Sequence, residues 1–92
     1  MVYIRGSICK PPFFKVTPNN KKITELVIKV NRNDDYSEYI PAITWFYDAY
    51  EAREWALGDE VELYGRFQSR EYHNGEKVTY EVSVSKVEKI FN

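Results

Sequence analysis

The sequence is poor in the residue types that carry most metal and nucleophilic chemistry. It contains one cysteine, Cys9, and one histidine, His73. A single cysteine excludes a disulfide within the chain, and too few histidines and cysteines are present for a structural zinc site. Asp34 and Asp35 carry carboxylates that could bind a metal ion, but turn formation is the better interpretation of this pair. We therefore expect no enzyme activity, no metal and no cofactor.

Long apolar runs are also missing. Residues Met1 to Cys9 include Arg5 and lack the apolar run of a signal peptide. No stretch approaches the ~20 consecutive apolar residues that a membrane helix needs. Together with the lone cysteine, these absences predict a cytoplasmic protein with no membrane partner.

Positive charge is not in excess. Thirteen Lys and Arg stand against fourteen Asp and Glu, a formal net charge of −1. A basic domain is the usual footprint of nucleic-acid binding, so composition alone gives no sign of such a partner. A protein that binds single strands can nevertheless combine a local basic groove with stacking rings, which leaves its other faces acidic. The distribution of the charges along the chain must therefore decide whether the protein binds nucleic acid.

Glycine and proline are sparse, with four of each among 92 residues, whereas aromatic residues reach 16%. This composition excludes a disordered or collagen-like chain, and the length allows one domain, residues 1–92, around one core. Aromatic side chains favour strands and fill the cores of small barrels. We expect the surplus of rings to form a stacking surface.

Alternation of apolar and polar residues with a period of two indicates five strands. They are expected at residues 2–8, 22–33, 38–47, 61–72 and 78–84. The Asn74-Gly75 dipeptide predicts a hairpin between the last two. A change of alternation after Val84 predicts a bulge or strand end near Ser85 and Lys86. The proline-containing stretch 9–21 is expected to be an irregular connection.

One short helix is expected after the third strand. Asp48 followed by Glu51 matches a capping box, and Gly58 is a stop signal. Three strands, a helix and a two-strand hairpin are the order of a five-stranded OB-fold, a Greek-key barrel of the all-β class. The helix then lies between strands 3 and 4. Another small barrel or an open α+β sheet is the alternative.

Two strands carry the candidate binding chemistry. Residues 38–47 are largely apolar on both faces, so one face must meet the helix, a partner subunit or a ligand. In residues 61–72, an inward set of Val61, Leu63, Gly65 and Phe67 is expected. The outward set then mixes rings and cations: Tyr64, Arg66, Gln68, Arg70 and Tyr72. Cations track phosphates and rings stack bases, at ~1–3 kcal/mol per base.

An ordered series of motifs spans nearly the whole chain. It comprises Gly6, Asn31-Arg32, Glu38-Tyr39-Ile40, Trp45, Leu57-Gly58-Asp59-Glu60-Val61, the segment from Gly65 to Tyr72, and Thr79-Tyr80-Glu81-Val82. This series resembles the bacterial single-stranded DNA-binding protein family, whose Gly-Arg-Leu-Gln-Thr-Arg segment is similar to residues 65–70. The resemblance implies an OB-fold that binds single-stranded DNA without sequence preference in replication, recombination, repair or mobile-element maintenance.

The resemblance also implies roles for individual residues. Tyr39, Trp45 and Tyr72 occupy the places of base-stacking rings, and Arg70 the place of a cation that contacts phosphate. Arg32 lies in the matching segment between strands 2 and 3. With the outward Arg66, the expected nucleic-acid site is Arg32, Tyr39, Trp45, Arg66, Arg70 and Tyr72. Three cations predict a slope of log affinity against log salt of about −2 per subunit.

Several departures from the family pattern shape the expected function. Pro41, Tyr47 and Glu71 stand where the family commonly has basic groups, which implies weaker binding. The family's acidic-tipped tail is not present after Ile90, which implies a short member or a primosomal-type relative, with an excised core as the alternative. A homo-oligomer, dimer or tetramer, is expected. RNA in place of DNA, or a protein-interaction module without strong nucleic-acid binding, are the other hypotheses.

Overall fold

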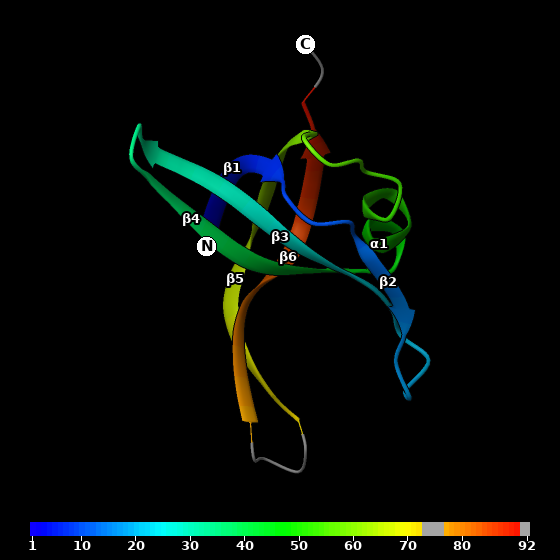
Figure 1. The fold of residues 1–92 in the computed structure, drawn as a ribbon. Helices are drawn as coiled ribbons and strands as arrows, with labels where there is room; N and C mark the ends of the chain where they lie inside the picture. Colours follow the sequence, from blue (N-terminus) through cyan, green and yellow to red (C-terminus); the bar gives the residue numbers. More distant parts are fainter. Residues whose placement is uncertain (73–76, 91–92) are drawn as a thin grey trace.

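A computed structural model describes residues 1–72 and 77–90 of the protein, which fold as one β-barrel with a single short helix (Figure 1). The elements are β1 (Val2–Ile8), β2 (Phe13–Val16), β3 (Lys22–Asn33), β4 (Tyr36–Trp45), α1 (Tyr47–Ala52), β5 (Glu60–Tyr72) and β6 (Lys77–Lys89). No helix in the described ranges is long and apolar enough to cross a membrane.

The strands form one sheet in the order β1-β5-β6-β4-β3-β2. All neighbours are antiparallel except β4 and β6, which pair in parallel at Ala42 and Ile43. A further pairing of β1 with β3, at Ser7 and Ile8, closes the sheet into a barrel of β1, β3, β4, β5 and β6. The helix α1 lies between β4 and β5 in the chain. The predicted five-stranded OB-fold with one helix is therefore confirmed.

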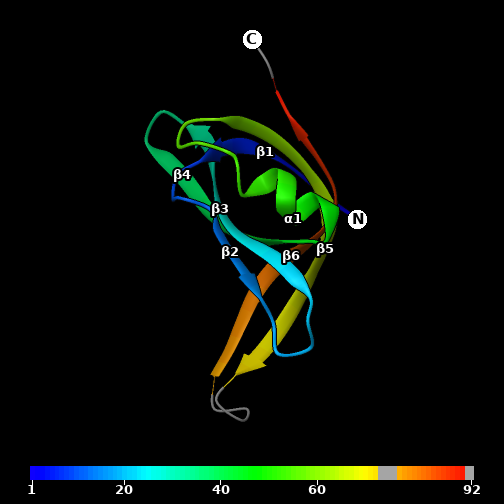
Figure 2. The ribbon, with the colours of Figure 1, turned by 90° about the vertical axis from the view of Figure 1, so that its right-hand side faces the viewer.

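The core fills the barrel with aliphatic side chains from every barrel strand. Its most buried members include Ile8, Ile28, Val61, Leu63 and Val82. Figures 1 and 2 show α1 covering one end of the barrel. The buried Thr24 hydroxyl donates a hydrogen bond of 2.6 Å to the Ala49 carbonyl oxygen, which ties α1 to β3. This bond satisfies a hydroxyl that burial would otherwise penalise.

The stretch 9–21 was expected to be irregular, but it contains the strand β2. Phe13–Val16 pairs with β3 in antiparallel register, from Phe13 opposite Glu25 to Val16 opposite Lys22. A tight turn joins the two strands, because Thr17 and Lys21 bond through their backbones and Asn20 takes a φ of 61°. Asparagine tolerates this left-handed conformation. The edge of β3 supplies the partner that the sequence pattern does not reveal.

The helix differs from its prediction at both ends. It spans Tyr47–Ala52, so Asp48 lies in its first turn and Phe46 takes the N-cap position without a side-chain hydrogen bond. The predicted capping box is therefore wrong. The helix ends well before Gly58 because the chain turns at Arg53 and places Trp55 in the barrel core, where 5% of its surface is exposed. Burying this large ring outweighs continuing an exposed helix.

The strands β5 and β6 continue past the barrel as a long hairpin (Figure 1). The predicted bulge is confirmed, because Tyr64 pairs with Lys86 and Gly65 with Val84, which leaves Ser85 without a partner. A Cβ atom on Gly65 would collide with the Ser83 carbonyl oxygen, so this position requires glycine. The predicted turn at Asn74-Gly75 lies outside the described residues, as does His73.

Phe67 contradicts the inward set expected for β5. Val61, Leu63 and Gly65 are buried as predicted, but 69% of the Phe67 surface is exposed. The alternation is regular, but the far part of β5 extends beyond the barrel and has no core to face (Figure 1). Phe67 instead lies with the exposed Val78 and Tyr80 on the side of the hairpin that continues the core-facing side of the barrel, opposite the side that carries Arg66 and Arg70.

Candidate nucleic-acid interface

Strand register brings residues from five strands onto one face of the sheet. Residues directly opposite each other on neighbouring strands point to the same face of the sheet. Along one strand, every second residue points to that face. Pairings run without interruption from Phe13 through Glu25, Ile43 and Ser83 to Arg66. We call this surface the groove face, which comprises Phe13, Lys15, Glu25, Tyr39, Pro41, Ile43, Trp45, Arg66, Gln68, Arg70, Glu81 and Ser83.

Tyr39 and Trp45, two predicted stacking residues, both lie on β4 in the groove face. Tyr39 exposes 60% of its surface, so its ring is open to a ligand. Trp45 is half-buried, and its indole Nε1 donates a hydrogen bond of 3.1 Å to the Ser83 hydroxyl. The Lys21 ammonium lies 5.9 Å from the Trp45 ring centroid. The Tyr39 ring is therefore open to solvent, and the Trp45 ring is held in a fixed orientation.

Arg70 sits between two carboxylates. Its Nε lies 2.6 Å from Glu81 Oε2, and its Nη2 lies 3.5 Å from Glu25 Oε1. Lys15 Nζ approaches the same Glu25 oxygen at 2.9 Å, and Gln68 Nε2 donates to Glu81 Oε2 at 2.6 Å. Glu81 is 5% exposed, so Arg70 and Gln68 balance a buried carboxylate that would otherwise be costly. We call Lys15, Glu25, Gln68, Arg70 and Glu81 the ion cluster.

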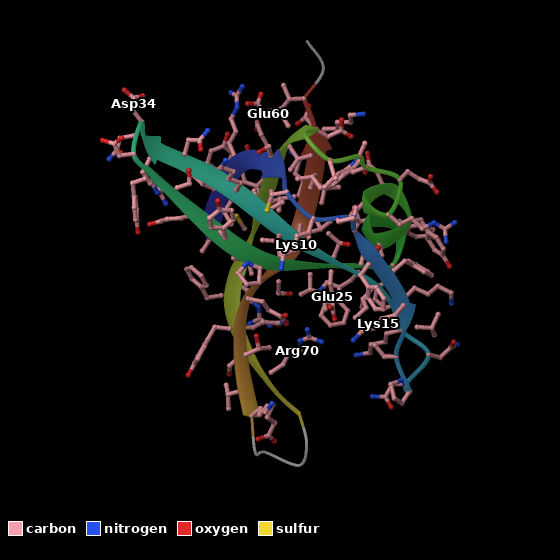
Figure 3. The ribbon with its side chains drawn as sticks, in the orientation of Figure 1. Lys10, Lys15, Glu25, Asp34, Glu60 and Arg70 are labelled. Carbon is pink, nitrogen blue, oxygen red and sulfur yellow. The ribbon has the colours of Figure 1, made fainter. Side chains whose placement is uncertain are left out.

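The ion cluster lies beside a groove between the hairpin and the β2–β3 edge of the sheet. The groove has a volume of about 300 Å³, and its lining residues include Lys10, Phe13, Pro41 and Arg70. Figure 3 shows Lys10, Lys15, Glu25 and Arg70 in this region, with Asp34 and Glu60 in the upper part of the view. The groove brings cations and the Phe13 ring together, the two components of single-strand binding, but Glu25 and Glu81 also line it.

The surroundings of Glu25 determine its ionisation. Partial burial by itself raises the pKa of the Glu25 carboxyl, but the Lys15 ammonium and the Arg70 guanidinium more than offset burial. The pKa of Glu25 therefore lies below its ordinary value. The carboxylate is ionised at neutral pH and keeps its hold on both cations.

The remaining predicted residues fall in three places. Arg66 is exposed on the groove face, and its side chain has no ion pair or hydrogen bond within residues 1–72 and 77–90. Arg32 pairs with Glu38 at 2.7 Å and borders a different hollow with Tyr3 and Ile40. Tyr72 ends β5 with its backbone opposite Lys77, and its ring lies outside the described part of the chain.

The structure thus unites Tyr39, Trp45, Arg66 and Arg70 and separates Arg32 from them. It adds Lys15, Glu25 and Glu81, which the sequence did not single out as site residues. The alternation of β3 already directs Glu25 away from the core, which was a usable signal. Lys15 had no such signal, because β2 was not recognised. No group of three potential metal ligands occurs in the described ranges.

A second set of rings follows Trp45 in the chain. Phe46 exposes 54% of its surface and Tyr47 exposes 89%. Nearby, the Arg53 guanidinium lies 4.8 Å from the Phe14 ring centroid and 4.9 Å from that of Tyr50. These cation–π contacts join β2 to the helix region. The end of the groove face at α1 is therefore rich in accessible rings.

Comparison with known proteins gives a family and a set of similar folds. A model of the single-strand binding protein family matches residues 1–90. The wild-type single-stranded DNA-binding protein from Thermus aquaticus has a TM-score of 0.82 at 19% identity, covering 98% of this chain and 39% of that chain. The chain thus spans about 39% of that protein's length. No curated protein sequence matches significantly.

Two other solved structures match most of their own length. The dimeric N-terminal domain of the PriB protein from Thermoanaerobacter tencongensis has a TM-score of 0.78 at 19% identity, covering 99% of this chain and 96% of that chain. The SSB domain of a Synechococcus protein has a TM-score of 0.75 at 19% identity, covering 94% and 90%. At these identities the likeness establishes the fold.

Proposed function

The chain belongs to the single-strand binding protein family, and from that premise we propose that it binds single-stranded DNA through its groove face. The observation that supports this best is the placement of Tyr39, Trp45, Arg66 and Arg70 on one continuous face. Rings for bases and cations for phosphates are the two components of sequence-tolerant strand binding.

Each component has a definite role in the proposed complex. Tyr39 stacks a base on its open ring, and Trp45, held by Ser83, stacks a second. Arg66 contacts phosphate directly, because no carboxylate of the described residues pairs with it. Every base has a π face, so stacking does not select sequence. Bases inside a duplex are already stacked on each other, so duplex DNA binds weakly.

Titration with an oligothymidine while Trp fluorescence is followed tests this proposal. Trp45 is half-buried and should be quenched by a stacked base, whereas Trp55 is 5% exposed and provides a constant background. A duplex of the same length is the control and should bind much more weakly. Equal affinity for duplex and single strand would overturn the proposal. An oligouridine tests the RNA alternative, since stacking does not sense the 2′-hydroxyl.

The second candidate is a protein-interaction module with the same fold. It is favoured by apolar side chains on the side of the hairpin that continues the core-facing side of the barrel, where Phe67, Val78 and Tyr80 expose 69%, 52% and 72% of their surfaces. An exposed apolar patch is typical of a protein-interaction surface. On this hypothesis the oligothymidine titration leaves the fluorescence of Trp45 unchanged.

A further inference from the structure

We infer that Glu25 is an internal competitor of DNA phosphate: its carboxylate neutralises Lys15 and Arg70 in the groove, and a bound strand must displace it to use either cation. This inference rests on the proposed function and identifies a residue that sets its affinity and its salt dependence.

Geometry places Glu25 between cations from two separate strands. A single oxygen, Oε1, lies 2.9 Å from Lys15 Nζ on β2 and 3.5 Å from Arg70 Nη2 on β5. The carboxylate therefore occupies the position where a phosphate oxygen would meet both positive charges. Figure 3 shows the three side chains together beside Lys10. A carboxylate and a phosphate bind guanidinium and ammonium groups through the same kind of charged oxygen.

The two acids of the ion cluster differ in their ability to move. Glu81 is 5% exposed and also accepts from Gln68 at 2.6 Å, so it is fixed in the protein interior. The Glu25 side chain exposes 35% of its surface and has the two cations as its charged partners. Water can solvate a displaced Glu25 carboxylate, whereas displacing Glu81 would leave a buried charge. Glu25 is therefore the exchangeable member.

The contacts of Arg70 leave room for a better acceptor. Its distance of 3.5 Å to Glu25 is at the limit of a hydrogen bond. Its Nε is buried and lies 2.6 Å from Glu81 without the alignment of a hydrogen bond. The attraction to Glu81 is thus electrostatic, and the guanidinium still has donor capacity. An incoming phosphate binds Arg70 by replacing Glu25, which is the weaker of the two carboxylate contacts of Arg70.

Charge neutralisation has a measurable consequence for salt dependence. Lys15 and Arg70 carry two positive charges and Glu25 and Glu81 two negative charges, so the cluster has no net charge. Each phosphate that a cation neutralises steepens the salt slope by about 0.7 for single strands. Glu25→Gln keeps the shape of the side chain but uncovers its cations, so the slope should steepen by about 0.7 to 1.4.

The experiment measures oligothymidine affinity over a range of salt for the wild type and three variants that each remove one negative charge. When the salt concentration is lowered about fourfold, the affinity of Glu25→Gln should increase by a factor about three to seven times larger than the increase for the wild type. Glu60→Gln and Asp34→Asn are the controls. Glu60 pairs with Arg5 at 3.3 Å, and neither control is among the residues that line the groove. Neither control should change the slope.

The outcomes separate the inference from the proposed function. If the wild type binds and Glu25→Gln has the slope of the controls, the inference is wrong and the function stands. If neither binds, both are wrong. Adding Lys15→Ala to Glu25→Gln should remove about 0.7 of the gained slope. Should Glu25→Gln not fold, NMR of the wild type provides the test, because loss of its contacts with Lys15 and Arg70 must raise the pKa of Glu25 when DNA binds. An unchanged pKa in the complex contradicts the inference.

Discussion

Phe46 joins β4 to α1 in a backbone conformation that side chains rarely adopt. Its φ is 53° and its ψ is −119°, and its ring is 54% exposed. Such strain costs ~1–3 kcal/mol and persists where other interactions impose it. Here the Phe46 carbonyl accepts from Ala49 and its N–H donates to the Lys22 carbonyl, which fixes the junction. The strain is therefore imposed by the ends of β3 and α1.

Phe46→Gly should raise the free energy of unfolding by roughly 1 kcal/mol, because glycine adopts this conformation without strain but loses more entropy on folding. Thermal unfolding should show the midpoint rising by several degrees. Tyr47→Gly is the matched control, since Tyr47 has an ordinary helical backbone and is 89% exposed. That change should lower the midpoint. A lower midpoint for Phe46→Gly would mean that packing of its ring outweighs the strain.

The stacking residues are tested one at a time. Tyr39→Ala, Trp45→Ala and Tyr72→Ala should each weaken oligothymidine binding by ~1–3 kcal/mol if each ring stacks a base. Anisotropy of a labelled oligonucleotide measures all three, since Trp45→Ala removes the fluorescent reporter. Tyr80→Ala is the control, because Tyr80 is 72% exposed on the side of the hairpin opposite the groove face. Loss of structure in Trp45→Ala, measured by circular dichroism, would instead assign Trp45 to the fold.

At the scale of elements, Asp59 secures the segment that leads from α1 into β5. The Ala56 backbone N–H donates to its carboxylate at 2.8 Å, and Lys89 on β6 lies 3.2 Å away. The Ala56 hydrogen bond lowers the pKa of Asp59, desolvation partly opposes it, and Lys89 adds to the lowering. A lowered folded-state pKa means that Asp59 stabilises the protein above its unfolded-state pKa.

Asp59→Asn should therefore lower the thermal midpoint at neutral pH, because the amide cannot pair with Lys89. As pH falls through the lowered pKa of Asp59, the wild type loses the same stabilisation, and the two midpoints should converge. Thermal unfolding from neutral to strongly acidic pH measures both. A difference that stays constant across this range would show that the charge of Asp59 has no part in stability.

At the scale of the whole molecule, β1 leaves part of one edge open. It pairs with β5 from Val2 to Ser7 but with β3 only at Ser7 and Ile8. Unpaired backbone groups along such an edge favour pairing with a second strand. We expect a homodimer or tetramer through this edge, with two-fold symmetry. Light scattering at tens of micromolar checks the mass, and a monomer would contradict this prediction.

The salt dependence of the wild type also belongs to the whole molecule. Three free arginines predicted a slope of about −2 per subunit, but Arg32 pairs with Glu38 and Arg70 with two carboxylates. Among the described residues Arg66 is then the one arginine of the three without a pair, and the expected slope becomes about −0.7. Oligothymidine binding from low to moderate salt measures it. A slope near −2 or steeper would show that the paired carboxylates do not reduce the contribution of Arg32 and Arg70 to the salt dependence.

The sequence by itself determined those features that depend on neighbours along the chain. The alternation in residues 22–33 predicted β3 with its observed bounds, and the loss of alternation predicted the bulge at Ser85. The same alternation placed Tyr39 with Trp45 and Arg66 with Arg70 on common strand faces. Side-chain direction in a strand follows from covalent geometry alone, so these predictions did not require the fold.

Tertiary structure alone decided which residues meet across the sheet. Glu25 and Arg70 are 45 positions apart, and their contact follows from the pairing of β3, β4, β6 and β5. Phe67 follows the alternation but is exposed, because the barrel ends before the strand does. The length of a strand and the charge of a residue are local properties. Whether a core lies beside that strand, or a carboxylate beside that charge, depends on segments distant in the sequence.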